Sequence, residues 1–233
     1  MKSVNTLRCL AVAATLLCAS ASSHASLIYA GSLQNTGSGF GNVNTVLTLN
    51  GSGNTATGSV IRSGGADVTT GDATSAGVQN ATFSFSQLNI TNANQIRLIF
   101  NASEPGNVNN SINLDAMTLS IYSDIGGAAL FSTSLAAGQF FATTENGIGS
   151  IGYAFILDAA STALAQSFVT GTNRIGLASS ISLATGGPDT FLISIAAGPQ
   201  GPGNSIPEPG SLLLLGLGLA GITASGLRKR AKQ

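Results

Sequence analysis

Short apolar runs separated by turn-forming residues fill the chain between residues 43 and 196. In Thr82–Ile90, for example, Phe83, Phe85, Leu88 and Ile90 are set among polar residues. Alternating or dense apolar runs of this length are typical of strands that bury at least one face. The pattern predicts strands at Val43–Leu49, Thr82–Ile90, Gln95–Phe100, Ile112–Tyr122, Ala128–Phe131, Ile151–Leu157, Arg174–Leu183 and Thr190–Ala196.

Glycine-rich turns separate these runs, among them Asn50–Gly53, Gly64–Asp67, Gly126-Gly127 and Gly186–Asp189. Glycine, proline and asparagine supply the backbone conformations that tight turns need. Eight or nine strands at this spacing predict an all-β domain over residues 26–197, built as an antiparallel β-sandwich or, more specifically, a jelly roll.

One segment breaks the β pattern. Asp158 is followed by AASTALAQSF, which ends at Phe168. An aspartate at this position can cap a helix, and Leu164 and Phe168 would then lie on one helical face. The sequence therefore predicts one short helix from Asp158 to Phe168.

The amino terminus has the pattern of a signal peptide. Lys2 and Arg8 form a basic region, and Leu10–Ala19 is an apolar core too short to span a bilayer comfortably. Small residues stand at the third and first positions before a cleavage between Ala25 and Ser26. We therefore predict a signal peptide at residues 1–25.

Removal of this segment would take away every thiol and imidazole. Cys9, Cys18 and His24 are the only cysteines and histidine of the chain. A mature protein beginning at Ser26 would have no disulfide, no Cys- or His-based zinc site, and no Cys-His or Ser-His-Asp catalytic centre.

The carboxyl terminus begins with a Gly/Pro-rich stretch at residues 198–205, which we interpret as a flexible linker. Ser211–Leu227 is an uncharged, mostly apolar run of 17 residues, at the lower limit of the roughly 17–25 that a helical span needs. The basic cluster Arg228, Lys229 and Arg230 follows, and such clusters stay in the cytoplasm. This predicts a transmembrane helix at 211–227 with the β domain facing outward into the periplasm.

Pro207, Glu208 and Pro209 directly precede the apolar run. Motif, span and basic end together make residues 206–233 resemble the PEP-CTERM sorting signal of diderm bacteria. That resemblance implies recognition and processing by an exosortase, delivery to the cell surface, and association with exopolysaccharide or biofilm. Such tails are also named after ice-binding proteins, a label that describes the tail and no ligand. The alternative interpretation is an ordinary tail anchor behind an unrelated linker.

Charge narrows the possible partners. The whole chain has nine basic and nine acidic side chains, but residues 26–205 contain three arginines against eight acids, a net charge of −5. A domain of this kind repels phosphate backbones, so no nucleic-acid partner is expected. The sequence contains no cofactor motif, and no cofactor is predicted.

Candidate chemistry within the domain is sparse. Asp67 and Asp72 lie in a polar segment and are weak calcium candidates beside the simpler interpretation as turn acids. Tyr29, Tyr122 and Tyr153 could form a carbohydrate platform, although tyrosines of β domains are usually packing residues.

Two functions follow from these observations. The first is an exported, non-enzymatic cell-surface or matrix protein. The alternative is a secreted carbohydrate-active enzyme that uses paired carboxylates. The chain has no tryptophan, and the predicted mature protein has no histidine or cysteine, which favours the first function.

Overall fold

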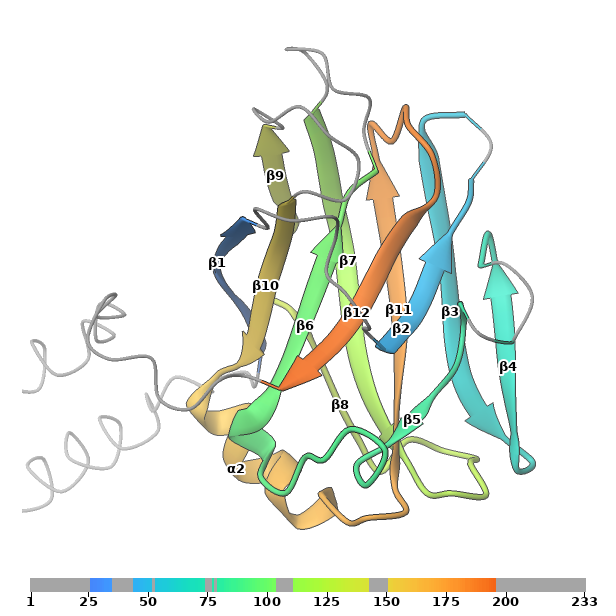
Figure 1. Ribbon diagram of the computed structural model, residues 1–233, viewed down its shortest axis with the longest axis vertical. Coiled ribbons are helices and arrows are strands. Elements are labelled where there is room, and N and C mark those ends of the chain that lie inside the picture. Colours follow the sequence, from blue (N-terminus) through green and yellow to red (C-terminus); the bar gives the residue numbers. More distant parts are fainter. Residues whose placement is uncertain are drawn as a thin grey trace, which may run out of the picture. The chain divides into compact units, whose positions relative to one another are not determined.

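The computed structural model describes residues 26–34, 44–51, 53–73, 77, 79–103, 111–142 and 151–195. These residues form twelve strands, one α-helix and two short 3-10 helices (Figure 1). The strands are β1 (Ser26–Gln34), β2 (Asn44–Leu49), β3 (Thr55–Ser63), β4 (Ala66–Gly71), β5 (Phe83–Ser84), β6 (Ile96–Asn101), β7 (Ser111–Tyr122), β8 (Phe131–Leu135), β9 (Gln139–Ala142), β10 (Ile151–Leu157), β11 (Arg174–Ser182) and β12 (Asp189–Ile195). The helices are η1 (Ala93–Gln95), α2 (Ala159–Ala165) and η2 (Gln166–Phe168).

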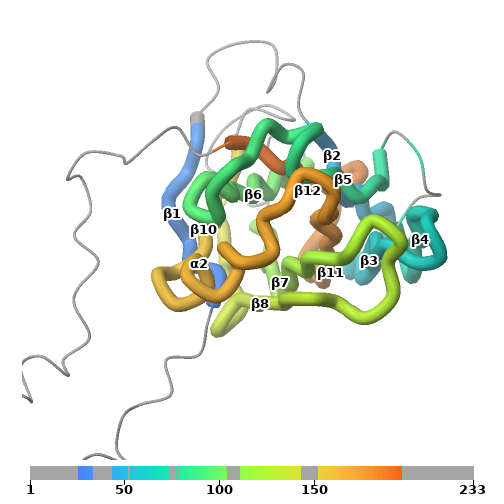
Figure 2. Tube along the Cα trace, turned by 90° about the horizontal axis from the view of Figure 1, so that it is seen from below, coloured from blue at the N-terminus to red at the C-terminus, as the bar shows by residue number. Residues whose placement is uncertain are grey.

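All twelve strands belong to one curled sheet. Its main path runs β2-β12-β6-β10-β1-β8-β7-β11-β3-β4, while β5 pairs with β11 and β9 pairs with β7. Figure 2 shows β2, β12, β6 and β10 lying opposite β8, β7, β11 and β3, with β1 at the fold between the two halves. All strand pairs are antiparallel except β1 with β8. The predicted all-β class is confirmed, and the two layers are halves of one continuous sheet.

The core lies between these two halves. Its largest fully buried side chains come from both, and they include Phe100, Phe155 and Phe191 from one half and Leu114, Met117 and Leu119 from the other. Phe141 of β9 stacks on Tyr153 of β10, with 3.8 Å between ring centroids, and meets the Phe155 ring edge-on. Because β9 pairs with β7 and Tyr153 belongs to the opposite half, these ring contacts join the two halves across the core.

Most predicted strands are confirmed to within a residue or two. These are 43–49, 95–100, 112–122, 151–157, 174–183 and 190–196. The prediction for Ala128–Phe131 is displaced, because a turn with positive φ at Gly126 and Gly127 occupies the preceding residues and the strand begins at Phe131. The strands β1 and β9 and most of the β3–β4 hairpin were not predicted. Gly64 and Gly65 turn this hairpin with φ of 57° and 76°, the left-handed conformation that a two-residue turn needs at both positions.

The predicted strand at Thr82–Ile90 is wrong beyond its first residues. Only Phe83–Ser84 is a strand, and successive turns follow up to Asn89, whose φ is +55°. Side chains compete here with the sheet for backbone groups: Gln87 Oε1 accepts from Ser84 N at 2.9 Å, and Ser84 Oγ accepts from Gln87 N at 3.2 Å. The apolar side chains of this segment nevertheless enter the core.

The predicted helix is confirmed. Asp158 caps α2 by accepting a hydrogen bond from Ser161 N through Oδ1 at 2.6 Å, and η2 extends the turn to Phe168. The predicted packing face is wrong in part. Leu164 is exposed, and the small residues Ser161 and Ala165 face the core instead.

No helix in the described part of the chain is long and apolar enough to cross a membrane. The predicted signal peptide (1–25), linker (198–205) and transmembrane helix (211–227) lie outside the described residues.

A substitution at Phe155 tests whether the core between the two halves of the sheet stabilises the fold. Phe155→Ala removes a fully buried ring that contacts both halves of the sheet, so we expect a loss of about 3–5 kcal/mol in the free energy of unfolding. Phe140→Ala is the matched control, because that ring is 62% exposed and its loss should change stability by less than ~0.5 kcal/mol. Urea denaturation followed by circular dichroism measures both. Equal losses for the two variants would contradict this assignment of the core.

Candidate functional site

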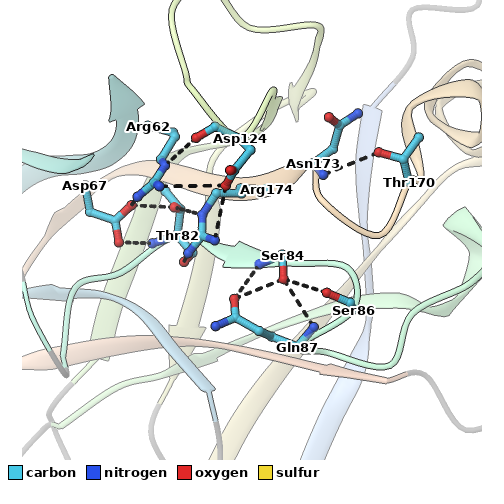
Figure 3. Close-up of polar contacts among 10 residues, drawn as sticks. All are labelled: Arg62, Asp67, Thr82, Ser84, Ser86, Gln87, Asp124, Thr170, Asn173 and Arg174. Atoms are coloured by element: carbon cyan, nitrogen blue, oxygen red, sulfur yellow. Dashed lines mark hydrogen bonds and ion pairs between the residues drawn. The ribbon is translucent and has the colours of Figure 1, made fainter. Parts of the chain in front are cut away.

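Five polar residues form a charge network at one end of the sheet (Figure 3). They are Arg62, Asp67, Thr82, Asp124 and Arg174. Arg62 Nη1 lies 3.1 Å from Asp67 Oδ1, and Arg62 Nε donates to the Asp124 carbonyl at 2.8 Å. The Asp124 carboxylate lies 3.7 Å from both guanidinium groups. Two of the three arginines of residues 26–205 are therefore held in one cluster.

Thr82 is the centre of the charge network. Its side chain is buried, and its hydroxyl donates to Asp67 Oδ1 and accepts from Arg174 Nε at 2.8 Å. The Thr82 carbonyl accepts from Arg174 Nη2 at 2.6 Å, and Thr82 N donates to Asp67 Oδ2 at 3.2 Å. One residue thus ties the β3–β4 hairpin to β11 through four hydrogen bonds.

Close contact between the Gly126-Gly127 turn and the backbone of β3 stabilises the region around the charge network. Gly126 has φ of +79°, and a Cβ built there would lie 2.2 Å from the Arg62 carbonyl oxygen. Gly127 N donates to that carbonyl at 3.2 Å. The Gly126-Gly127 turn therefore lets the β7–β8 loop approach β3 and bring Asp124 to the arginines.

The two calcium candidates do not meet. Asp67 forms an ion pair with Arg62 and accepts a hydrogen bond from the Thr82 hydroxyl. Asp72 Oδ2 instead accepts a hydrogen bond from Thr57 N at 2.8 Å. Among the described residues no group of three or more His, Cys, Asp or Glu side chains is placed to hold a metal ion. Both aspartates make structural contacts, Asp67 from strand β4 and Asp72 from the turn that follows it.

The remaining aspartates of the described residues also have structural partners. Asp115 accepts from Ser182 Oγ at 3.0 Å, and Asp189 Oδ1 accepts from Ser103 N at 2.8 Å. Asp158 caps α2, and Asp124 belongs to the charge network. Each of these carboxylates already takes part in holding the fold.

The three tyrosines do not form an exposed platform. Tyr122 and Tyr153 are only 8% and 5% exposed, and Tyr29 is 42% exposed. Burial raises the pKa of Tyr153, and neighbouring Tyr29 raises it further, so both phenols stay neutral at physiological pH. The tyrosines act mainly as packing residues, which corrects the platform interpretation.

Small hydroxyl side chains cover the outer face of β8, β7, β11, β3 and β4, which we call the hydroxyl face. One row follows the strand register from Ser134 through Thr118, Ala178 and Ser59 to Thr70. Neighbouring hydroxyls pair with each other, at 2.8 Å for Thr118 with Ser134 and 2.7 Å for Ser59 with Thr70. The row is uncharged and rich in groups that can both donate and accept hydrogen bonds.

Ser26, the residue after the predicted cleavage, is the first described residue and is firmly held. Its backbone N and its Oγ both donate to Asp158 Oδ2, at 2.9 and 3.0 Å. Its carbonyl accepts from Asp158 N at 3.0 Å and from Ser161 Oγ at 3.2 Å. Ala25 and the sorting residues Pro207, Glu208, Pro209, Arg228, Lys229 and Arg230 lie outside the described residues.

Sequence reasoning missed the charge network and the hydroxyl face. Thr82 and Arg174 are 92 residues apart, so no local pattern joins them. A usable signal existed for the hydroxyl face, because Thr55 and Thr57 alternate around the buried Ala56 on β3.

Comparison with known protein families assigns the carboxyl terminus. Residues 205–230 match the family described as the PEP-CTERM protein-sorting motif. The match contains the triplet Pro207, Glu208 and Pro209, the predicted apolar span and the basic cluster. No curated protein and no solved structure matches the chain.

Thr82→Val tests the charge network. Valine keeps the shape but removes the hydroxyl, leaving Arg174 Nε and Asp67 each short of a partner in a largely buried site. We expect a loss of about 1–3 kcal/mol in the free energy of unfolding. Thr70→Val is the control, because the hydroxyl pair that it breaks is solvent-exposed. Chemical denaturation measures both, and indistinguishable midpoints would show that the network contributes no net stability.

Proposed function

We propose that this chain, which carries the PEP-CTERM protein-sorting motif, is an exported, non-enzymatic cell-surface or matrix protein that contacts extracellular polysaccharide. The match over residues 205–230 is the observation that carries the proposal, because the motif indicates a precursor that is exported and then sorted by an exosortase. The export and sorting signals lie at the two ends of the chain, and the β domain between them is the part that is exported.

In this proposal the signal peptide is cut between Ala25 and Ser26, and the 211–227 helix holds the precursor in the inner membrane. The basic residues Arg228, Lys229 and Arg230 stay in the cytoplasm, so the β domain faces the periplasm until the exosortase acts at the motif. The mature form then reaches the cell surface or the extracellular matrix.

Two observations support a non-enzymatic role. Every described aspartate accepts a hydrogen bond or forms an ion pair within the fold, which gives each of them a structural role. The mature domain would also lack cysteine and histidine. These observations favour a binding or packing protein over the carbohydrate-active enzyme.

The hydroxyl face is the surface that we assign to polysaccharide contact. A neutral polymer presents many hydroxyls, and the serine and threonine side chains of the row can exchange hydrogen bonds with it directly or through water. The central five positions carry no charge, so no charged group has to lose its hydration shell when a neutral polymer approaches.

Glu208→Ala tests sorting, with Glu145→Ala as the control outside the motif. From a strain with its sorting machinery intact, we expect the native chain and the control to yield surface material that begins at Ser26 and lacks Leu212–Gln233. Glu208→Ala should leave the tailed form in the inner membrane, because the exosortase no longer recognises it. Intact mass and cell fractionation measure this. A tail that persists in the native chain would mean a plain membrane-anchored protein.

Thr118→Arg tests the hydroxyl face, with Thr172→Arg as the control in an exposed loop elsewhere. A long charged side chain in the row holds a flat polymer away and must be desolvated for contact, so retention on the producer's own exopolysaccharide should weaken roughly tenfold. The control adds the same charge and should bind as the native protein does. Equal binding by both variants would remove the hydroxyl face from the proposal, and no retention of the native protein would count against polysaccharide contact altogether.

A further inference from the structure

The first residues of the β domain lie where the curled sheet closes. Residues Leu27–Gln34 of β1 pair antiparallel with β10, and Ser26 and Leu27 pair parallel with Ser134 and Leu135 of β8. Among the described strands, only β1 joins the two halves along the path of the sheet. Ser26 and Leu27 are therefore the residues through which β1 reaches β8.

Asp158 holds Ser26 at this closure. Both the backbone N and the Oγ of Ser26 donate to Asp158 Oδ2, while Asp158 Oδ1 is occupied by Ser161 N. Ser161 Oγ in turn contacts the Ser26 carbonyl and Thr133 Oγ1 of β8, the latter at 3.1 Å. The carboxylate thus reaches the nitrogen that signal-peptide removal would turn into a chain terminus.

We propose that Asp158 is the receptor for the α-ammonium group of the mature protein, so that removal of the signal peptide converts a hydrogen bond at Ser26 N into an ion pair that fastens β1 at the closure. The inference rests on the cleavage between Ala25 and Ser26 that is part of the proposed function. Processing at this position would thereby stabilise the domain in addition to releasing it.

The chemistry of the step is ordinary peptide hydrolysis by a signal-peptide endopeptidase. Water adds across the Ala25–Ser26 amide, the C–N bond breaks, and Ala25 keeps a carboxylate. Ser26 leaves with an α-amino group, which takes up a proton at neutral pH. The Ser26 nitrogen gains a positive charge and two further N–H donors within reach of a carboxylate that is already 2.9 Å away.

No cationic side chain of the described elements around Asp158 competes with the new amino terminus for its carboxylate. The elements that pack around it, β1, β8, β10 and α2, contain no Lys, Arg, His or Glu, and their other titratable side chains are Tyr29 and Tyr153. Arg97 of β6, which pairs with β10, is directed to Ser194 Oγ and the Ile195 carbonyl, both at 3.0 Å. The mature α-ammonium would be the one cation within hydrogen-bonding distance among these elements.

Burial acts to raise the pKa of Asp158, but hydrogen bonds from Ser161 and Ser26 outweigh it and hold that pKa below its ordinary value. The carboxylate is therefore ionised at neutral pH and available to a cation. Its attraction in turn favours the charged form of the amine, so the α-amine pKa should lie above its ordinary range of about 7.7–8.0. The stabilisation is fully present below that range and is lost as pH rises through the raised value in the folded protein.

The composition of the domain makes the amine directly measurable. Lys2, Lys229 and Lys232 are the only lysines of the chain, so the α-amine would be the only amine of a mature protein that has lost its tail. The processed protein is isolated from the producing cells, its first residue is identified by mass spectrometry, and the rate of acylation by an amine-reactive ester is followed against pH. The same titration in concentrated urea gives the reference value without any substitution.

We expect the first residue to be Ser26 and the α-amine pKa to be about one unit higher in the folded than in the urea-unfolded protein. At a pH below both pKa values, the unprotonated and reactive fraction of the folded amine is then roughly tenfold smaller, and its acylation is slower by that factor in addition to any slowing by burial. Asp158→Asn should remove this difference. Asp115→Asn, the same change at an aspartate bonded only to Ser182 in the described structure, should preserve it.

Two results would overturn the inference. Equal amine pKa values in the folded and unfolded native protein would show that no ion pair forms, even if Asp158→Asn fails to fold. A mature chain beginning at another residue would remove the ammonium from Ser26, while surface material lacking its tail would still support sorting through the carboxyl-terminal motif.

Discussion

The structure depends on the closure of one sheet by its first strand. The apolar faces of the two halves can cover each other only if the sheet curls, and β1 is the strand at which it does so, antiparallel to β10 and parallel to β8. Burial of the side chains between the halves supplies the main driving force. The contacts of Ser26 with Asp158 and Ser161 hold the first described residue of this strand against the start of α2.

Charge is scarce in the β domain, and much of it is used internally. Two arginines and two aspartates meet in the charge network, where Thr82 satisfies both signs at once. A buried hydroxyl with both a cationic donor and an anionic acceptor is well placed, because each contact strengthens the other in surroundings of low polarity. The central row of the hydroxyl face, from Ser134 to Thr70, carries no charge, which supports the proposed contact with uncharged polymers.

The ends of the chain and its middle have separate tasks. The sorting motif at residues 205–230 indicates a precursor that is exported and sorted to the cell surface. Amino-terminal processing differs, because the predicted cleavage leaves a residue that the fold itself binds. Under the proposed cleavage, export and folding would be coupled at Ser26 through the carboxylate of Asp158.

The sequence by itself determined the features that local chemistry decides. Alternation of apolar and polar residues predicted β7, β10 and β11, and Asp158 was predicted to cap the helix. The tail was recognisable from its motif, apolar span and basic end. Tertiary structure decided the rest. The segment Thr82–Ile90 has a strand-like pattern, yet its polar side chains bond their own backbone, which a periodic pattern does not report. Periodicity shows which face is buried but not against what, so the partnership of Ser26 with Asp158, 132 residues away, existed only once the sheet had closed.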